Sequence, residues 1–236
     1  MAAGPETEEL VRRALAYPYD PPAHSFVQVG GRTLPLPAEG VDLSGRRALL
    51  AYGANAAPEA LTRKLAGLPP EPLPVLRVAL GGWDVVYSAH LTRYGAVPAA
   101  AVASPGAVAS VHLAFPTASQ LAALAATEGR NYRLERLVDF TCESEAGGEA
   151  APPEIDVFVS VYGPLLLDGS PVALAAIPAR GRAFPELPTA AMLDRVRAAL
   201  APEFDLTGFI LRTVERGGLA PLPELKSRRR PGRLVT

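Results

Sequence analysis

Residues that would support disulfides or a membrane anchor are scarce in this sequence. The single cysteine, Cys142, excludes an intrachain disulfide and a cysteine-rich zinc site, and it favours a reducing compartment. No apolar run approaches the roughly 18 residues of a membrane span, and the acidic start MAAGPETEEL lacks the apolar segment of a secretory signal. We therefore expect a cytoplasmic protein without membrane contact.

Histidines and phosphate-binding motifs are scarce as well. The three histidines, His24, His90 and His112, lie far apart, and no two have the spacing of metal ligands on one helix. The sequence contains no nucleophile elbow, no P-loop and no complete dinucleotide-binding glycine fingerprint. These absences argue against a metal site, a serine hydrolase, a phosphate-binding loop and a Rossmann domain.

The sequence also has no excess of positive or negative charge: the formal net charge is −1, and charged residues make up 20% of the chain. With 49% hydrophobic residues, this composition is typical of a folded soluble protein and argues against a globally basic nucleic-acid binder. The basic cluster KSRRRPGR carries five positive charges between Lys226 and Arg233. It contains no aromatic residue, so we favour a solvated terminus over a segment that binds nucleic acid or anionic lipid.

A succession of helix and strand patterns is present. Helix patterns cover residues 7–16, a segment that begins near Pro58, residues 117–127 and residues 189–200. Strand patterns lie in the segments 25–36, 47–51, 74–91, 99–115, 131–143 and 155–163. We expect the pairs Gly81-Gly82 and Pro105-Gly106 to divide their segments into two strands each. These patterns predict a mixed α+β fold with a strongly bent sheet or a small mixed β-barrel and flanking helices.

The order of these patterns suggests a main domain with two extensions. We expect residues 1–45 to form an N-terminal extension of one helix and one hairpin packed on the main domain, which covers residues 46–200. We expect residues 201–236 to form a C-terminal extension with the basic tail. The hairpin turns at a Gly-Gly pair, and prolines in its second arm indicate an edge strand. An acidic, glycine-containing loop, Ser144 to Pro153, separates the last two strand segments.

The segment LLAYGANAAPEAL, residues 49–61, is the first of two candidate sites. A strand, a tight turn and a helix line up backbone N–H groups at the positive end of the helix dipole, where a carboxylate is stabilised. Gly53 would let the backbone approach a ligand closely, and Asn55 could donate or accept a hydrogen bond. In the alternative interpretation, Gly53 only makes the turn and Asn55 only caps the helix.

Glu128, in ALAATEGRNY, is the second candidate site. We expect it at the C-terminal end of a helix that Gly129 stops, where the helix dipole disfavours an anion. In a partly dry cleft, desolvation would add to this effect and make the carboxylate a better general base near neutral pH. The alternative is an exposed glutamate paired with Arg130 or Arg133.

The YGAN and EGRNY motifs, taken together, resemble the γ-glutamylcyclotransferase-like superfamily. That family has a Tyr-Gly-Ser-Asn-like loop after its first barrel strand and a Glu-Gly element with a following tyrosine after a short helix. The intervening LTRYGAVPAAAVASPGAVASVHLAF is similar to the family's pattern of a glycine, a small strand, a Pro-Gly turn and a strand leading into the helix. The similarity is best over residues 49–137 and extends to about residue 200.

The resemblance implies a barrel with flanking helices and a cavity beside the first loop. Family members cyclise a γ-glutamyl group to 5-oxoproline without a cofactor, and they release an amino acid, peptide or amine. The substrate α-carboxylate would be held by the backbone amides of Tyr52, Gly53, Ala54 and Asn55. Glu128 would take a proton from the α-ammonium and pass it to the leaving nitrogen, while Tyr132 would frame the cavity or bond to Glu128.

Three positions depart from the family pattern. Ala54 stands where the family usually has serine, which removes a hydroxyl from the loop but leaves its backbone donors. Ser110 stands where a glycine is common, and Tyr162 is the nearest counterpart of a later family tyrosine. These departures keep open an alternative, a homologue of altered activity that acts as a small-molecule binding module. In the loop AIPARGRAFPELP, Arg180 and Arg182 either meet an anionic substrate or lie in solvent.

Overall fold

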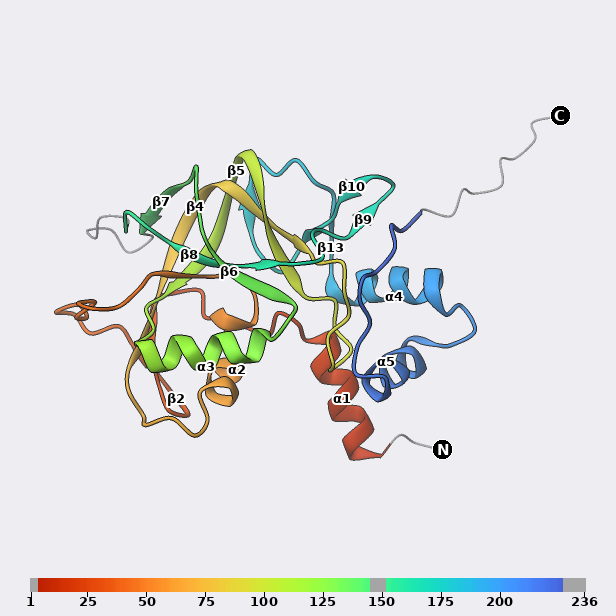
Figure 1. Ribbon diagram of the computed structural model, residues 1–236, viewed down its shortest axis with the longest axis horizontal. Coiled ribbons are helices and arrows are strands. Elements are labelled where there is room, and N and C mark those ends of the chain that lie inside the picture. Colours follow the sequence, from red (N-terminus) through yellow and green to blue (C-terminus); the bar gives the residue numbers. More distant parts are fainter. Residues whose placement is uncertain (1–3, 145–151, 227–236) are drawn as a thin grey trace.

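The computed structural model describes residues 4–144 and 152–226, which form a mixed α+β chain (Figure 1). Within these residues, an eleven-stranded sheet and a two-stranded ribbon are accompanied by five α-helices. The α+β class predicted from the sequence is confirmed. The strand order runs from β13 (Glu186–Leu187) to β6 (Tyr132–Arg136), and these two end strands do not pair with each other. The described strands therefore form an open sheet.

The centre of the sheet is the antiparallel pair of β4 (Leu73–Tyr87) and β5 (Ala99–Ala114). The other edge of β4 pairs in turn with β1 (Phe26–Val29), β7 (Thr141–Ser144) and β11 (Ala173–Leu174). The other edge of β5 pairs with β12 (Ala179–Arg180) and β3 (Leu49–Ala51). Beyond β3 lie β8 (Asp156–Ser160), in parallel, and then β6. The remaining pairs are β2 (Arg32–Pro35) with β1, β13 with β11, and β9 (Leu166–Leu167) with β10 (Ser170–Pro171).

Both long strands pass through the points at which the sequence predicted breaks. Pairing is regular up to Gly81 opposite Val108, and it resumes with Trp83 opposite Ala103. Gly82 has φ 87°, a conformation that glycine adopts at low cost, and it accommodates the shift as a bulge. The prediction of four shorter strands was therefore wrong. The irregularity lies within one pair of long, curved strands (Figure 1).

Four helices lie where the sequence predicted them: α1 (Pro5–Leu15), α2 (Pro58–Lys64), α3 (Ala118–Glu128) and α4 (Thr189–Leu200). A capping box begins α3, because Thr117 Oγ1 accepts the backbone N–H of Gln120 at 3.3 Å and Gln120 Oε1 accepts the backbone N–H of Thr117 at 3.0 Å. The sequence analysis missed α5 (Leu206–Glu215). Its signal was Asp205, whose carboxylate caps the helix by accepting the Gly208 N–H at 2.7 Å.

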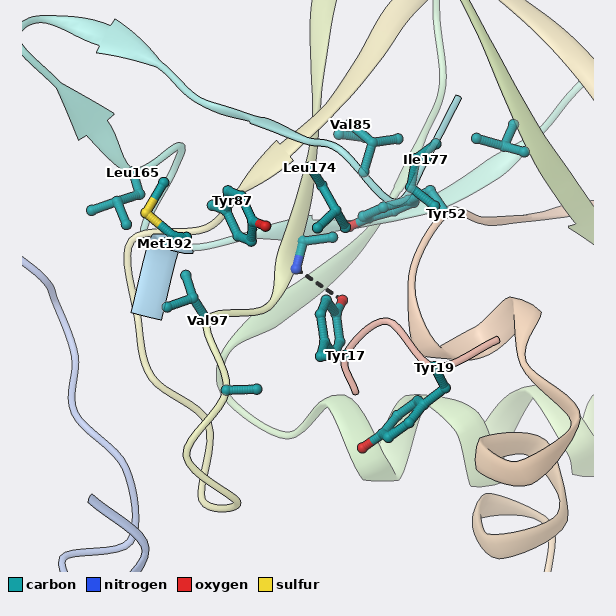
Figure 2. Close-up of a cluster of buried hydrophobic side chains, with 14 of the residues drawn as sticks. Tyr17, Tyr19, Tyr52, Val85, Tyr87, Val97, Leu165, Leu174, Ile177 and Met192 are labelled. Carbon is teal, nitrogen blue, oxygen red and sulfur yellow. Dashed lines mark hydrogen bonds between the residues drawn. The ribbon is translucent and has the colours of Figure 1, made fainter. Parts of the chain in front are cut away.

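The helices cover two apolar clusters. The larger cluster includes residues of α1, α4 and α5, such as Ala14, Met192 and Ile210, and these three helices gather at one end of the molecule (Figure 1). It also contains the aromatic side chains of Tyr17, Tyr52 and Tyr87 (Figure 2). The smaller cluster joins Leu61 of α2 and Leu124 of α3 to the sheet. Burial of the apolar side chains in these two clusters is the main source of stability for the packing of the helices on the sheet.

The hairpin predicted at residues 25–36 is confirmed. Strands β1 and β2 pair in the register Val29 with Arg32, so Gly30 and Gly31 form the turn. Within the described part of the chain, β2 pairs only with β1, as the prolines in its arm predicted for an edge strand. Because β1 pairs with β4, the N-terminal segment is joined to the sheet. The proposed domain boundaries at residues 45 and 200 stay a prediction.

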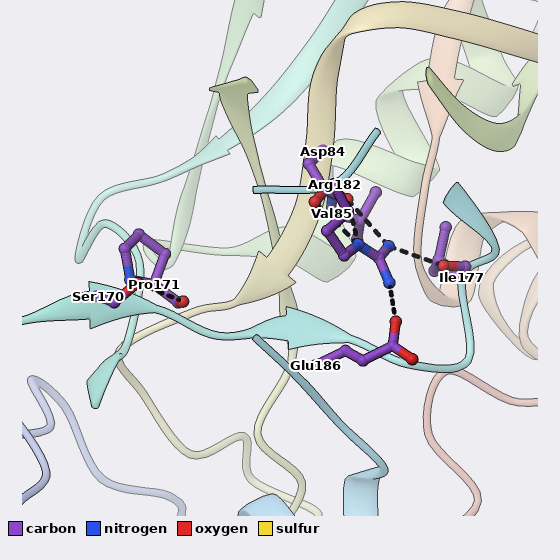
Figure 3. A network of polar contacts seen from close by, with 7 residues as sticks. All are labelled: Asp84, Val85, Ser170, Pro171, Ile177, Arg182 and Glu186. Atoms are coloured by element: carbon purple, nitrogen blue, oxygen red, sulfur yellow. Dashed lines mark hydrogen bonds and ion pairs between the residues drawn. The ribbon is translucent and has the colours of Figure 1, made fainter. Parts of the chain in front are cut away.

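A buried ion pair fixes the loop that carries Arg182 (Figure 3). The Arg182 guanidinium donates to Asp84 Oδ1 and Oδ2 at 3.0 and 2.9 Å, to the Ile177 carbonyl at 2.8 Å and to Glu186 at 2.6 Å. The Asp84 side chain is wholly buried and that of Arg182 is 8% exposed. Protein groups therefore surround the Arg182 guanidinium, and the expectation that it lies in solvent was wrong. Its contact with an anionic substrate stays a prediction. Arg180 is exposed on β12.

Parts of two predicted segments lie outside the described residues: most of the loop from Ser144 to Pro153, and the basic tail beyond Lys226. Between residues 4 and 226, leaving aside 145–151, no helix is both long and apolar enough to cross a membrane.

Candidate active-site cavity

A cavity of about 420 Å³ gathers the residues that the sequence singled out. Its wall is built from α1, the loop after β3, the ends of α2 and α3, and the segment between β4 and β5. The lining residues are Arg13, Tyr17, Tyr52, Gly53, Ala54, Asn55, Arg63, Lys64, His90, Thr92, Arg93, Tyr94, Pro98, Ala99, Ala126, Thr127, Glu128, Asn131, Tyr132 and Phe158. Thus all six predicted site residues, from segments distant in sequence, line one cavity.

Glu128 occupies the end of α3 as expected, with Gly129 following at φ 58°. Its side chain is only 14% exposed, and its Oε1 accepts the Asn55 side-chain N–H at 3.1 Å. This hydrogen bond joins the two candidate sites directly. The alternative that Glu128 pairs with Arg130 or Arg133 was wrong, because its ion-pair partner is a different residue.

That partner is Lys64, which the sequence analysis missed. Its ammonium donates to Glu128 Oε1 and to Asn55 Oδ1, both at 2.8 Å, and its side chain is 15% exposed. The three side chains therefore form a closed triangle of hydrogen bonds. Among the described residues, no partner is recorded for Glu128 Oε2. In the sequence, Lys64 is one basic residue in the last turn of a short helix, a position typical of a surface charge.

The structure of the YGAN loop contradicts one part of the alternative interpretation, in which Asn55 caps the helix. Ala54 to Ala56 form a single 3₁₀ turn, and the N-cap of α2 is Ala57, so the Asn55 side chain does not cap that helix. Gly53 does allow a close approach, but the approaching group is part of the protein. A Cβ at this position would lie 2.5 Å from the hydroxyl oxygen of Tyr17. The glycine therefore makes room for the N-terminal segment against the loop.

Buried tyrosines form the inner wall of the cavity. Tyr132 donates its hydroxyl hydrogen to the Ala99 carbonyl at 2.7 Å, so it frames the cavity and is not hydrogen-bonded to Glu128. Tyr52 donates to the carbonyl of Phe158, and Tyr17 accepts the Ala99 N–H at 2.8 Å, the dashed contact in Figure 2. Burial raises the pKa of Tyr52, Tyr17 and Tyr132, so these phenols are neutral at physiological pH.

His90 is a second cavity residue to which the sequence analysis gave no role beyond excluding a metal site. The ring is 1% exposed, its Nδ1 lies 2.8 Å from Ser88 Oγ, and it packs against the rings of Tyr132 and Tyr162 at 5.6 and 5.1 Å between centroids. Burial lowers the pKa of His90 to about 4, so the imidazole is neutral at pH 7. Among the described residues, its Nε2 has no hydrogen-bond partner.

A larger cavity of about 520 Å³ lies against Arg46, Arg136 and Asp156, and none of the predicted site residues lines it. No group of three or more histidine, cysteine or acidic side chains within residues 4–144 and 152–226 is arranged to hold a metal ion. We therefore focus on the smaller cavity, where a carboxylate, an amide and an ammonium group meet.

Comparisons with protein-family models, with curated proteins and with solved structures give no match. The function is therefore inferred from the chemistry of the cavity and from the two sequence motifs that meet in it.

Proposed function

We propose that this protein is a γ-glutamylcyclotransferase-like enzyme, which cyclises a γ-glutamyl group to 5-oxoproline and releases an amine or amino acid. One observation carries the proposal: Asn55 of the YGAN loop and Glu128 of the EGRNY motif, 73 residues apart in sequence, are hydrogen-bonded within one cavity. A general base and a carboxylate-binding loop on the same cavity are the groups that this reaction needs. In this proposal, the bent sheet corresponds to the small barrel of the family.

The proposed reaction uses Glu128 as both base and acid. Its carboxylate accepts a proton from the substrate α-ammonium, and the freed amine attacks the γ-carbonyl carbon. A carbon–nitrogen bond forms to close the five-membered ring, and the bond to the leaving nitrogen breaks. Glu128 returns this proton to that nitrogen as the bond breaks. The ring nitrogen then loses its second proton, which passes through Glu128 to the released amine, so the products are 5-oxoproline and an ammonium group and Glu128 is again a carboxylate.

Positioning supplies most of the rate in such a ring closure, since nucleophile and carbonyl belong to one molecule. The proposed role of residues 52–55 is to hold the α-carboxylate so that the glutamyl chain folds back on itself. The general base then adds about 10²–10⁴-fold. Ala54 is compatible with this role because the contacts come from backbone N–H groups.

The Lys64 ammonium supports the assignment in a specific way. It lies 2.8 Å from Glu128 Oε1, which is the contact that the proposed mechanism requires between a substrate ammonium and this carboxylate. Because the second oxygen, Oε2, has no recorded partner among the described residues, a substrate ammonium can bind there without displacing Lys64. Lys64 then holds the carboxylate in a fixed orientation.

The same ion pair favours a second candidate, a catalytically altered homologue that binds small molecules without converting them. The carboxylate of Glu128 is already hydrogen-bonded to an ammonium of the protein, so it is less free to contact a substrate amine. This candidate predicts saturable binding of γ-glutamyl ligands with no release of 5-oxoproline.

Release of 5-oxoproline from glutathione, γ-glutamyl amino acids and γ-glutamyl amines tests the proposal. We expect the substitution Glu128→Gln to lower this activity by at least about 10²-fold, because an amide cannot accept the proton, while the fold stays intact. Glu59→Gln is the matched control, since Glu59 lies on α2 outside the cavity lining. Equal activity of wild type and Glu128→Gln would disprove the mechanism, and binding without turnover would support the second candidate.

A further inference from the structure

The cavity is unusually rich in positive charge. Arg13, Arg63, Lys64 and Arg93 line it, against the single carboxylate of Glu128. Lys64 is neutralised by Glu128 at 2.8 Å. Arg63 lies 3.5 Å from Glu59, which is outside the cavity lining. An excess of cationic over anionic side chains around a cavity creates a positive potential that attracts anionic ligands.

Arg13 stands out among these cations because α1 carries it into the cavity wall. Its guanidinium carbon lies 4.6 Å from the centre of the Tyr94 ring, a stacking contact that fixes the plane of the group. The Nε atom is buried without a hydrogen-bond partner, and no ion pair of Arg13 is recorded among the described residues. Burial raises the pKa of Tyr94, so its phenol is neutral and does not compensate the charge.

A partly buried guanidinium that no carboxylate contacts through a hydrogen bond is costly unless an anion binds to it. The carboxylate that lines the same cavity, Glu128, is already held by Lys64 and Asn55. In the proposed function, residues 52–55 bind the α-carboxylate of the glutamyl group. The charge of Arg13 is then available to a second anionic group, on the part of the ligand that is released.

We propose that Arg13 binds a carboxylate on the leaving portion of the ligand and makes the cavity selective for γ-glutamyl amino acids or peptides over γ-glutamyl amines. The γ-glutamyl part of this proposal rests on the proposed function. The role of Arg13 rests on its own geometry, since a planar guanidinium binds a carboxylate through two parallel N–H donors. Arg63 and Arg93 add to the potential that draws the anion in.

Two ligands that differ by one carboxylate test the selectivity: γ-glutamyl-2-aminobutyrate and γ-glutamylpropylamide. Release of 5-oxoproline and equilibrium binding are measured in parallel for wild type, Arg13→Gln and Arg13→Lys. The control is Arg212→Gln, which removes a guanidinium stacked on Phe204 at 4.8 Å, outside the cavity lining. The specificity is the ratio of kcat/KM for the two ligands, or of Kd where there is no turnover.

We expect the wild type and Arg212→Gln to prefer the carboxylate-bearing ligand by at least about tenfold, the lower range for a charge-assisted contact. Arg13→Gln should reduce the ratio to near one, and Arg13→Lys should give an intermediate ratio. Because a ratio is compared, a partial loss of folded protein does not alter the outcome.

The two proposals fail in different ways. Turnover of both ligands with equal specificity, or a preference that survives in Arg13→Gln, would overturn the role of Arg13 alone. An Arg13-dependent preference in binding without any 5-oxoproline would support Arg13 and overturn the enzymatic function. Absence of both binding and turnover for the two ligands would overturn both proposals.

Discussion

At the residue scale, the cavity shows how burial changes the chemistry of polar side chains. Tyr52 and His90 are nearly inaccessible and Tyr132 is partly buried, and burial favours the neutral form of each. Glu128 and Lys64, in contrast, form an ion pair at 2.8 Å. The cavity thus combines neutral buried side chains with the hydrogen-bonded set of Asn55, Lys64 and Glu128.

His90 makes the stability of the protein depend on pH. The folded protein holds this ring unprotonated down to a pKa of about 4, whereas the unfolded chain binds the proton near the ordinary value of 6.5. The unfolded state therefore binds more protons between these values, so the free energy of unfolding falls as the pH is lowered from 6.5 to 4. The loss at pH 4.5 is on the order of 2–3 kcal/mol.

Urea unfolding at pH 7 and pH 4.5 measures this effect. We expect His90→Gln to remove most of the His90 contribution to the difference between the two pH values, because glutamine does not titrate. His24→Gln is the control, since His24 is exposed and lies outside the cavity lining, and it should behave as the wild type. A wild-type pH dependence in His90→Gln would contradict the prediction.

At the element scale, the sheet depends on two long strands that bend instead of ending. Gly82 has φ 87°, and a Cβ there would lie 2.8 Å from the Asp139 carbonyl oxygen. Gly106, opposite in the same irregular region, also has φ 87°, but a Cβ there would meet no atom within 4 Å. The two glycines therefore share the backbone conformation and differ in the space around them.

Substitution of these glycines separates the two effects. We expect Gly82→Ala to lower the free energy of unfolding by more than Gly106→Ala, which should cost about 1 kcal/mol, the lower range for left-handed backbone strain alone. Gly82→Ala adds a contact with backbone that cannot move away cheaply. Chemical denaturation of both variants measures the difference, and equal losses would show that the steric contact carries no cost.

At the scale of the whole molecule, the Asp84–Arg182 pair links β4 to the segments around β11 and β13, almost 100 residues later (Figure 3). The Arg182 guanidinium also donates to the Ile177 carbonyl and to the Glu186 carboxylate. Because Asp84 is wholly buried, removal of the guanidinium would leave a desolvated carboxylate without its counter-ion.

We expect Arg182→Met to lower the free energy of unfolding by about 3–5 kcal/mol. Arg180 lies two residues away on β12 and is exposed, so Arg180→Met should change the free energy of unfolding by no more than about 0.5 kcal/mol. Replacing both partners, Asp84→Leu with Arg182→Met, should recover part of the loss because no buried charge is left unpaired. Denaturant unfolding of the four proteins tests this, and a small effect of Arg182→Met would contradict it.

Local sequence patterns determined the positions of α1 to α4, the hairpin around Gly30 and the helix stop at Gly129, because these features depend on neighbours a few residues away. They also placed Glu128 at a helix end. Only the tertiary structure decided what Glu128 meets: Lys64, 64 residues earlier, and Asn55, 73 residues earlier. In the same way, the fold alone brings Arg13 into the cavity wall. No local periodicity encodes such contacts, since they arise when separate elements pack and their buried polar groups require partners.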